Sequence, residues 1–188
     1  MKKSIGAREM IFPNPVMIVG TYDKDGAPNA ANFAWGGIAA SEPMAISVAV
    51  RPSRYTFENL NLKKAFTVNL PSPSFTAEAD YFGIASGRDV NKFEKTGLTP
   101  VSGDFVDAPY IEEFPVNIEC AVLHAIDLGS HTLFIGEIKD IKVDEALAAD
   151  LKGLWHAAQI LTYDSFAMSY RLPGEEVAKA FSCGLKFQ

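Results

Sequence analysis

The chain has 188 residues, of which 48% are hydrophobic and 11% aromatic, so it can bury one core but is too short for two full domains. A net charge of −6 argues against nucleic-acid binding, which depends on a basic surface. No apolar run approaches the length of a membrane span, and residues 1–10 lack the apolar segment of a signal peptide. We therefore expect a single cytoplasmic domain over residues 1–188, without a nucleic-acid or membrane partner.

The first third of the chain predicts a hairpin, two further strands and a helix. Residues 16–22 and the segment from Ala27 onward flank a tight turn rich in aspartate and glycine. The unbroken apolar run 44–50 has the length of a strand buried on both faces. A helix is expected over residues 55–64, followed by a strand over residues 66–70.

The middle of the chain predicts two short helices and a loop. The first helix begins at the N-cap Ser72 and ends at Gly83. The second is capped by Asp89 and terminated by Gly97. Residues 99–114 carry several acidic side chains and are expected to form a surface loop.

The last third predicts a long hairpin and a shorter C-terminal helix. Apolar residues occupy every second position of residues 115–126, as in a half-buried strand, and residues 131–143 are expected to form its hairpin partner. A helix over 145–158 and an extended segment over 160–170 follow. Antiparallel strands with short helices favour a mainly β barrel or sandwich, and the absence of a GxGxxG motif argues against a Rossmann domain.

A ligand site is predicted where the strand 44–50 ends. Arg51 and Arg54 bring two guanidinium groups there, and a helix beginning near Thr56 adds unpaired backbone N–H groups, so an anionic group such as phosphate is favoured. Trp35 and nearby amides lie one strand upstream and offer an aromatic face. Taken singly, Trp35 also fits a core aromatic and the arginines a solvated strand end. Their clustering favours a planar heterocycle with a phosphate tail.

The cysteines and histidines give no independent site. Cys120 fits a small buried hydrophobe, and Cys183 fits either a reactive thiol or a packing residue. The three histidines lack the acidic or thiolate partners of a metal site, so no metal is expected.

Several segments in order along the chain resemble the flavin reductase-like, FMN-binding split-barrel family, most closely its flavoredoxin branch. The matching segments are 13–21 (PNPVMIVGT), 29–38 (NAANFAWGGI), 51–59 (RPSRYTFEN), 65–69 (AFTVN), 80–93 (DYFGIASGRDVNKF) and 181–184 (FSCG). The resemblance implies an antiparallel, Greek-key, FMN-binding split β-barrel with short flanking helices. The family's usual C-terminal ending differs from residues 171–175 of this chain, which leaves the outer wall of the site open to either Phe166 or Tyr163.

The resemblance also implies a cofactor and its contacts. It implies FMN rather than FAD, with NAD(P)H as a candidate electron donor, and a homodimer that serves a small-molecule or protein redox partner. Since the chemistry takes place on the flavin, no catalytic protein residue is expected. The expected cofactor-binding residues are Asn29, Asn32, Phe33, Ala34, Trp35, Ala49, Val50, Arg51, Ser53, Arg54, Tyr55, Thr56, Ser86, Gly87, Asn91, Lys92, His131 and Phe166.

Two functions follow from these expectations. The first is an oxidoreductase, either an NAD(P)H-dependent flavin reductase or a flavoredoxin-type electron carrier. The second is a non-catalytic β-barrel binding or interaction module that keeps the family fold. The colour of the purified protein separates them, because only a flavoprotein is yellow.

Overall fold

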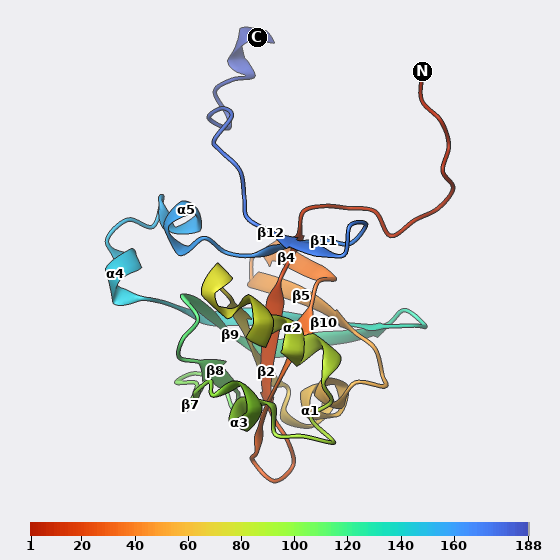
Figure 1. The fold of residues 1–188 in the computed structure, drawn as a ribbon, viewed down its shortest axis with the longest axis vertical. Coiled ribbons are helices and arrows are strands. Elements are labelled where there is room, and N and C mark those ends of the chain that lie inside the picture. Colours follow the sequence, from red (N-terminus) through yellow and green to blue (C-terminus); the bar gives the residue numbers. More distant parts are fainter. Residues whose placement is uncertain (188) are drawn as a thin grey trace.

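A computed structural model describes residues 1–187 (Figure 1). The strands are β1 (Asn14–Pro15), β2 (Met17–Tyr22), β3 (Pro28–Phe33), β4 (Gly36–Ser41), β5 (Met44–Val50), β6 (Ala65–Leu70), β7 (Pro100–Ser102), β8 (Pro109–Ile111), β9 (Val116–Asp127), β10 (Thr132–Val143), β11 (Thr162–Asp164) and β12 (Ser169–Arg171). The helices are α1 (Tyr55–Lys63), α2 (Thr76–Ile84), α3 (Lys92–Thr96), α4 (Glu145–Ala148) and α5 (Leu154–Ala158), with 3-10 turns η1 (Pro73–Phe75) and η2 (Leu185–Phe187). The mainly β, antiparallel class expected from the sequence is confirmed.

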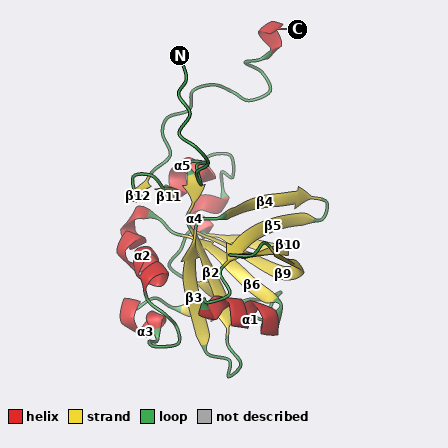
Figure 2. Cartoon of the chain, turned by 90° about the vertical axis from the view of Figure 1, so that its right-hand side faces the viewer, coloured by secondary structure: helices red, strands yellow, loops and turns green. Residues whose placement is uncertain are grey.

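A seven-stranded sheet with the order β3-β2-β6-β9-β10-β5-β4 forms the body of the molecule. It curves strongly (Figure 2), and a hydrogen bond of 2.8 Å from the amide of Ala49 to the carbonyl of Trp35 joins β5 to the chain just after β3. This hydrogen bond extends the β4–β5 pairing, and β3 itself also contacts β5, so strands near opposite ends of the strand order meet. This meeting brings the segment around Trp35 beside the end of β5, where the sequence predicts the ligand site.

Two apolar cores lie on the two sides of the β2 and β3 region. The first fills the interior of the curved sheet and includes Val48, Phe66 and Phe134, all essentially without exposed surface. The second lies between β2, β3 and the helices α2 and α3, and includes Phe82 and Phe93. Burial of these large side chains supplies the main driving force for folding. It also fixes α2 beside β3.

Strand β5 has the predicted bounds but is not buried on both faces. Ile46, Val48 and Val50 point into the core, whereas Ser47 and Ala49 are half-buried. Its alternation is that of a strand with one core face. The opposite face contributes to the candidate site described below.

Two expectations for the middle of the chain are wrong. Asn91, not Asp89, caps α3, because its side-chain oxygen accepts a 3.2 Å hydrogen bond from the amide of Glu94. Residues 99–114 are not merely a surface loop. They contain the β7–β8 hairpin, and Ile111 and Phe114 are buried in the second core.

The C-terminal third is more interrupted than the sequence suggests. The expected helix 145–158 is divided into α4 and α5, because the carboxylate of Asp150 accepts hydrogen bonds from the amides of Lys152 and Gly153 and forms a turn. Residues 160–170 form not one extended segment but the β11–β12 hairpin, which pairs with β1. The predicted half-buried alternation of β9 is wrong, because its first five residues are all buried and its outer half is exposed.

Both chain termini extend away from the body (Figure 1). They carry large exposed apolar side chains, among them Ile11, Phe12, Val177 and Phe181. Within residues 1–187, no helix has both the length and the apolar character needed to cross a membrane.

Candidate functional site

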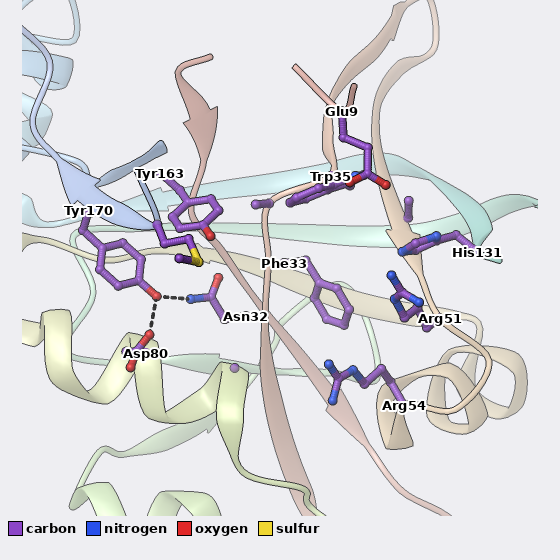
Figure 3. A pocket seen from close by; sticks show the side chains of 14 residues that line it. Glu9, Asn32, Phe33, Trp35, Arg51, Arg54, Asp80, His131, Tyr163 and Tyr170 are labelled. Atoms are coloured by element: carbon purple, nitrogen blue, oxygen red, sulfur yellow. Dashed lines mark hydrogen bonds between the residues drawn. The ribbon is translucent and has the colours of Figure 1, made fainter. Parts of the chain in front are cut away.

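A cavity of about 510 Å³ lies where β3, the connection from β3 to β4 and the end of β5 meet α2 and the β11–β12 hairpin (Figure 3). Eight of the predicted cofactor-binding residues line it: Asn32, Phe33, Ala34, Trp35, Ala49, Arg51, Arg54 and His131. Phe33 and Trp35 supply aromatic surface, and Trp35 is 39% exposed, so it is not the core aromatic of the alternative interpretation. This part of the site suits a planar ring.

A second cavity of about 180 Å³ shares Asn32, Phe33, Arg54 and Gly83 with the first and therefore continues from it. Its walls come from the start of α1 and from the loop between α2 and α3. The predicted residues that line it in addition to the shared ones are Asn29, Ser53, Tyr55, Thr56, Ser86, Gly87 and Lys92. The sequence thus predicts both parts of one elongated site.

The part of the site at the start of α1 is basic. Helix α1 begins at Tyr55 after the N-cap Arg54, and no side chain caps its first turn. Among residues 1–187, neither Arg51 nor Arg54 forms a salt bridge. Backbone N–H groups and two uncompensated guanidinium groups make this end suited to an anion.

An unpaired acceptor lies in the wall of the second cavity. Asn29 is 4% exposed, and its amide nitrogen donates a 3.2 Å hydrogen bond to the hydroxyl of Thr56, but its side-chain oxygen has no partner within residues 1–187. A side chain at Gly87 would collide with that oxygen, so only glycine fits beside it. A buried acceptor left unpaired costs about 1–3 kcal/mol, which a hydroxyl-bearing ligand would recover.

Lys92 brings a buried amine to the same wall. The side chain is 4% exposed, and its ammonium donates hydrogen bonds to the carbonyls of Phe82 at 3.2 Å and Ala85 at 3.4 Å. Burial, with a smaller contribution from the charge of Arg54, lowers the pKa of Lys92 to about 8. A bound anion would stabilise the charged form.

Several predicted residues contribute to the site in other ways. The hydroxyl of Tyr55 donates a 2.9 Å hydrogen bond to Asp23 and is therefore engaged within the protein. The hydroxyl of Ser86 accepts from the amide of Arg88 and shapes the loop. Asn91, the cap of α3, lines a neighbouring cavity of about 270 Å³ together with Lys92.

Two predicted residues do not line these cavities. Val50 is fully buried in the first core, which places it behind the site. Phe166 is 51% exposed in the turn between β11 and β12. The outer wall is instead formed by Tyr163, the alternative that the sequence left open, and by Met168 of the same hairpin.

Sequence reasoning missed Glu9, Asp80, Gly83 and Tyr170, which also line the larger cavity. The hydroxyl of Tyr170 donates a 2.8 Å hydrogen bond to Asp80 and accepts one of 3.3 Å from the amide of Asn32. Burial, followed by the bond to Asp80, raises the pKa of Tyr170 well above its usual range. The aspartate lies inside a recognised motif, but the pairing spans 90 residues and leaves no local signal.

Comparison with known proteins assigns the family. The model of the flavin reductase like domain matches residues 8–164. The chain belongs to this family. Flavoredoxin of Desulfovibrio vulgaris (Miyazaki F) is 45% identical, with a TM-score of 0.92 over 98% of this chain and 100% of that one.

Two further relatives span nearly the whole chain. Flavoredoxin from Methanosarcina acetivorans is 25% identical, with a TM-score of 0.88 over 100% of both chains. An uncharacterized protein of Aquifex aeolicus is 31% identical over 94% of this chain and 90% of its own length. The expected kinship with flavoredoxin and the split-barrel fold are thereby confirmed.

Proposed function

We propose that this protein is an FMN-binding flavoprotein that transfers reducing equivalents. The observation that carries the proposal is the continuous site in which the uncompensated Arg54 and the uncapped start of α1 stand at one end and Trp35 at the other. A mononucleotide flavin combines a phosphate, a hydroxylated chain and a planar ring in that order. When bound, the flavin supplies the redox chemistry, accepting and donating electrons in one- or two-electron steps.

The residues present fit each part of this cofactor. Arg51, Arg54 and Lys92 would balance the phosphate charge, and Ser53 and Thr56 offer hydroxyls beside it. The unpaired oxygen of Asn29 would accept from the hydroxylated chain. Aromatic faces flank the space for the ring. FMN is favoured over FAD because the basic groups gather at one end of the site, where a terminal phosphate would lie.

The experiment is an anaerobic titration of the purified protein, followed by mass identification of the released flavin. For a reductase, we expect the released flavin to be FMN, and we expect NADH or NADPH to bleach the absorbance of the bound flavin. Bleaching by dithionite but not by either nicotinamide nucleotide would make the protein a carrier of flavoredoxin type. Failure to bind any flavin would overturn the proposal and favour a non-catalytic module.

We also propose a homodimer. The terminal segments 1–12 and 172–187 carry large apolar side chains, including Phe12 at 57% and Phe181 at 99% exposure, and extend from the body. Apolar surface of this extent is stabilised by contact with another chain, and a twofold dimer is the commonest such assembly. Sedimentation is expected to give twice the monomer mass, and a stable monomer with full flavin occupancy would exclude the dimer.

A further inference from the structure

Arg88 joins two walls of the second cavity. It belongs to the loop between α2 and α3, and its guanidinium donates a 2.9 Å hydrogen bond to the carbonyl of Ser53, just before α1. The same group pairs with Glu58 of α1 at 2.6 Å and lies over the ring of Tyr55, 5.3 Å from its centroid. A guanidinium suits this arrangement because it donates at its edge and stacks with its face. Arg88 therefore ties the loop to the start of α1.

The charge of Arg88 is engaged within the protein. Glu58 balances it, whereas Arg51 and Arg54 at the same end of the site form no salt bridge within residues 1–187. A guanidinium that is already paired and stacked is less available to a phosphate than an unpaired one. Arg88 therefore bears on the shape of this end of the site more than on its charge.

Closely packed residues separate the second cavity from a neighbouring one. A Cβ at Gly87 would collide with the side-chain oxygen of Asn29 and would lie 3.0 Å from the ring of Tyr55, so these groups leave no gap. Five residues line both the second cavity and the neighbouring cavity of about 270 Å³, and they therefore lie between the two. We call them the end wall: Asn29, Tyr55, Gly87, Arg88 and Lys92.

The cavity beyond the end wall is acidic. Asp23 and Asp89 line it, and the two cations that also line it, Arg88 and Lys92, belong to the end wall itself. The hydroxyl of Tyr55 donates a 2.9 Å hydrogen bond to Asp23, which anchors the aromatic part of the end wall from the far side. Two carboxylates disfavour a second phosphate in this neighbouring cavity.

We propose that Arg88 is a specificity-determining residue, which keeps the end wall closed and so restricts the site to a mononucleotide flavin. FMN ends at its phosphate, on the near side of the end wall. FAD continues into a second phosphate and an adenosine, for which the closed end wall leaves no path into the neighbouring cavity. The inference rests on the proposed function and deepens it by naming the residue that selects FMN over FAD.

The test compares the affinities of the flavin-free protein for FMN, FAD and riboflavin by isothermal titration. For the wild type, we expect FMN to bind about a hundredfold more tightly than FAD. Arg88→Ala should open the end wall and raise the affinity for FAD about tenfold. The affinities for FMN and riboflavin should change by no more than about twofold, because Arg88 is not expected to hold the phosphate.

A second variant and a control isolate the tie between the loop and α1. Glu58→Gln removes the partner of Arg88 without altering the loop, and it should raise the affinity for FAD roughly threefold. Lys139→Ala breaks a salt bridge on β10 whose cation is 37% exposed, against 39% for Arg88. This control should leave all three affinities unchanged.

Three results would overturn the inference. The first is equal affinity of the wild type for FMN and FAD. The second is an unchanged FAD affinity in Arg88→Ala and Glu58→Gln variants that keep the wild-type melting temperature. The third is a loss of FMN affinity without a loss of riboflavin affinity in Arg88→Ala, since it would make Arg88 a phosphate ligand.

Failure of the proposed function is a different result, because no flavin would then bind. Hydrogen exchange in the flavin-free protein still decides whether Arg88 holds the loop, in which the amides of Asp89 and Val90 donate to the carbonyl of Ser86. Residues 86–91 should exchange faster in Arg88→Ala and not in Lys139→Ala. Unchanged exchange in Arg88→Ala would overturn the closing role of Arg88.

Discussion

The ammonium of Lys142 lies 3.0 Å from the carboxylate of Glu119, a side chain with no exposed surface. The same carboxylate accepts hydrogen bonds from the backbone amides of Asp104, Phe105 and Val106. One buried anion thus fixes the loop between β7 and β8 onto β9. Its charge is balanced by the lysine and by three backbone dipoles.

Replacing this buried carboxylate should be costly. Glu119→Ala leaves three amides and the lysine without their acceptor, so we expect a loss of about 3–5 kcal/mol in the free energy of unfolding. Urea unfolding of the flavin-free protein measures it. Glu137→Ala, which removes the partner of Lys139 from a partly exposed pair on β10, is the control and should cost about 1 kcal/mol or less. Equal effects of the two substitutions would contradict a structural role for Glu119.

The sequence predicts local structure better than it predicts distant contacts. The bounds of β5 and the start of α1 at Tyr55 follow from apolar runs and polar boundaries that lie close together in the chain. Asp80 and Tyr170 belong to elements that only folding brings together, so no spacing rule connects them. Asp89 and Asn91 both suit the cap of α3 by residue type, and only the backbone geometry distinguishes them.

The arginine at the start of α1 offers a test of the phosphate end. Arg54→Ala should weaken FMN about ten- to a hundredfold, because one charge-assisted hydrogen bond contributes about 1.5–3 kcal/mol. Riboflavin has no phosphate, so Arg54→Ala should reduce its affinity much less. Trp35→Ala should reduce the affinity for both flavins, because it removes an aromatic face beside the ring. Isothermal titration of the flavin-free protein measures each affinity.

The same comparison with Thr56→Ala examines the buried hydroxyl beside Arg54. Lys139→Ala, a partly exposed cation on β10, should change neither affinity. If Arg54→Ala and Thr56→Ala weakened FMN and riboflavin equally, the phosphate would have to bind elsewhere.

Glycine at position 87 allows the α2–α3 loop to approach β3 closely. A methyl group there would meet the side chain of Asn29 and the ring of Tyr55, which lies 3.0 Å away. Gly87→Ala should displace Asn29 from Thr56 and weaken FMN and riboflavin alike, by roughly tenfold, at a cost of about 1–3 kcal/mol in stability. Gly174→Ala, where an added Cβ meets nothing within 4 Å, is the matched control. Flavin titration and thermal melting measure the two effects, and unchanged binding by Gly87→Ala would remove the loop from the site.

The lowered pKa of Lys92 predicts how FMN affinity depends on pH. Burial, then the charge of Arg54, brings the pKa from 10.5 to about 8, so the flavin-free protein loses this charge as the pH rises through 8. A phosphate anion favours the charged amine, and binding above pH 8 must therefore take up a proton. FMN affinity should be flat just below pH 8 and fall by up to about tenfold per pH unit above it. Riboflavin should show little of this slope.

Lys92→Gln isolates the effect, because it removes the titrating group and should flatten the FMN profile. Lys95→Gln, an exposed lysine at the end of α3, should leave the profile as in the wild type. Stability gives an independent readout. The unfolded chain binds the proton more tightly than the folded one, so the free energy of unfolding of the flavin-free protein should gain a contribution between pH 8 and 10.5 that Lys92→Gln abolishes. A wild-type slope in FMN affinity that persists in Lys92→Gln would assign the titration to another group and separate Lys92 from the phosphate.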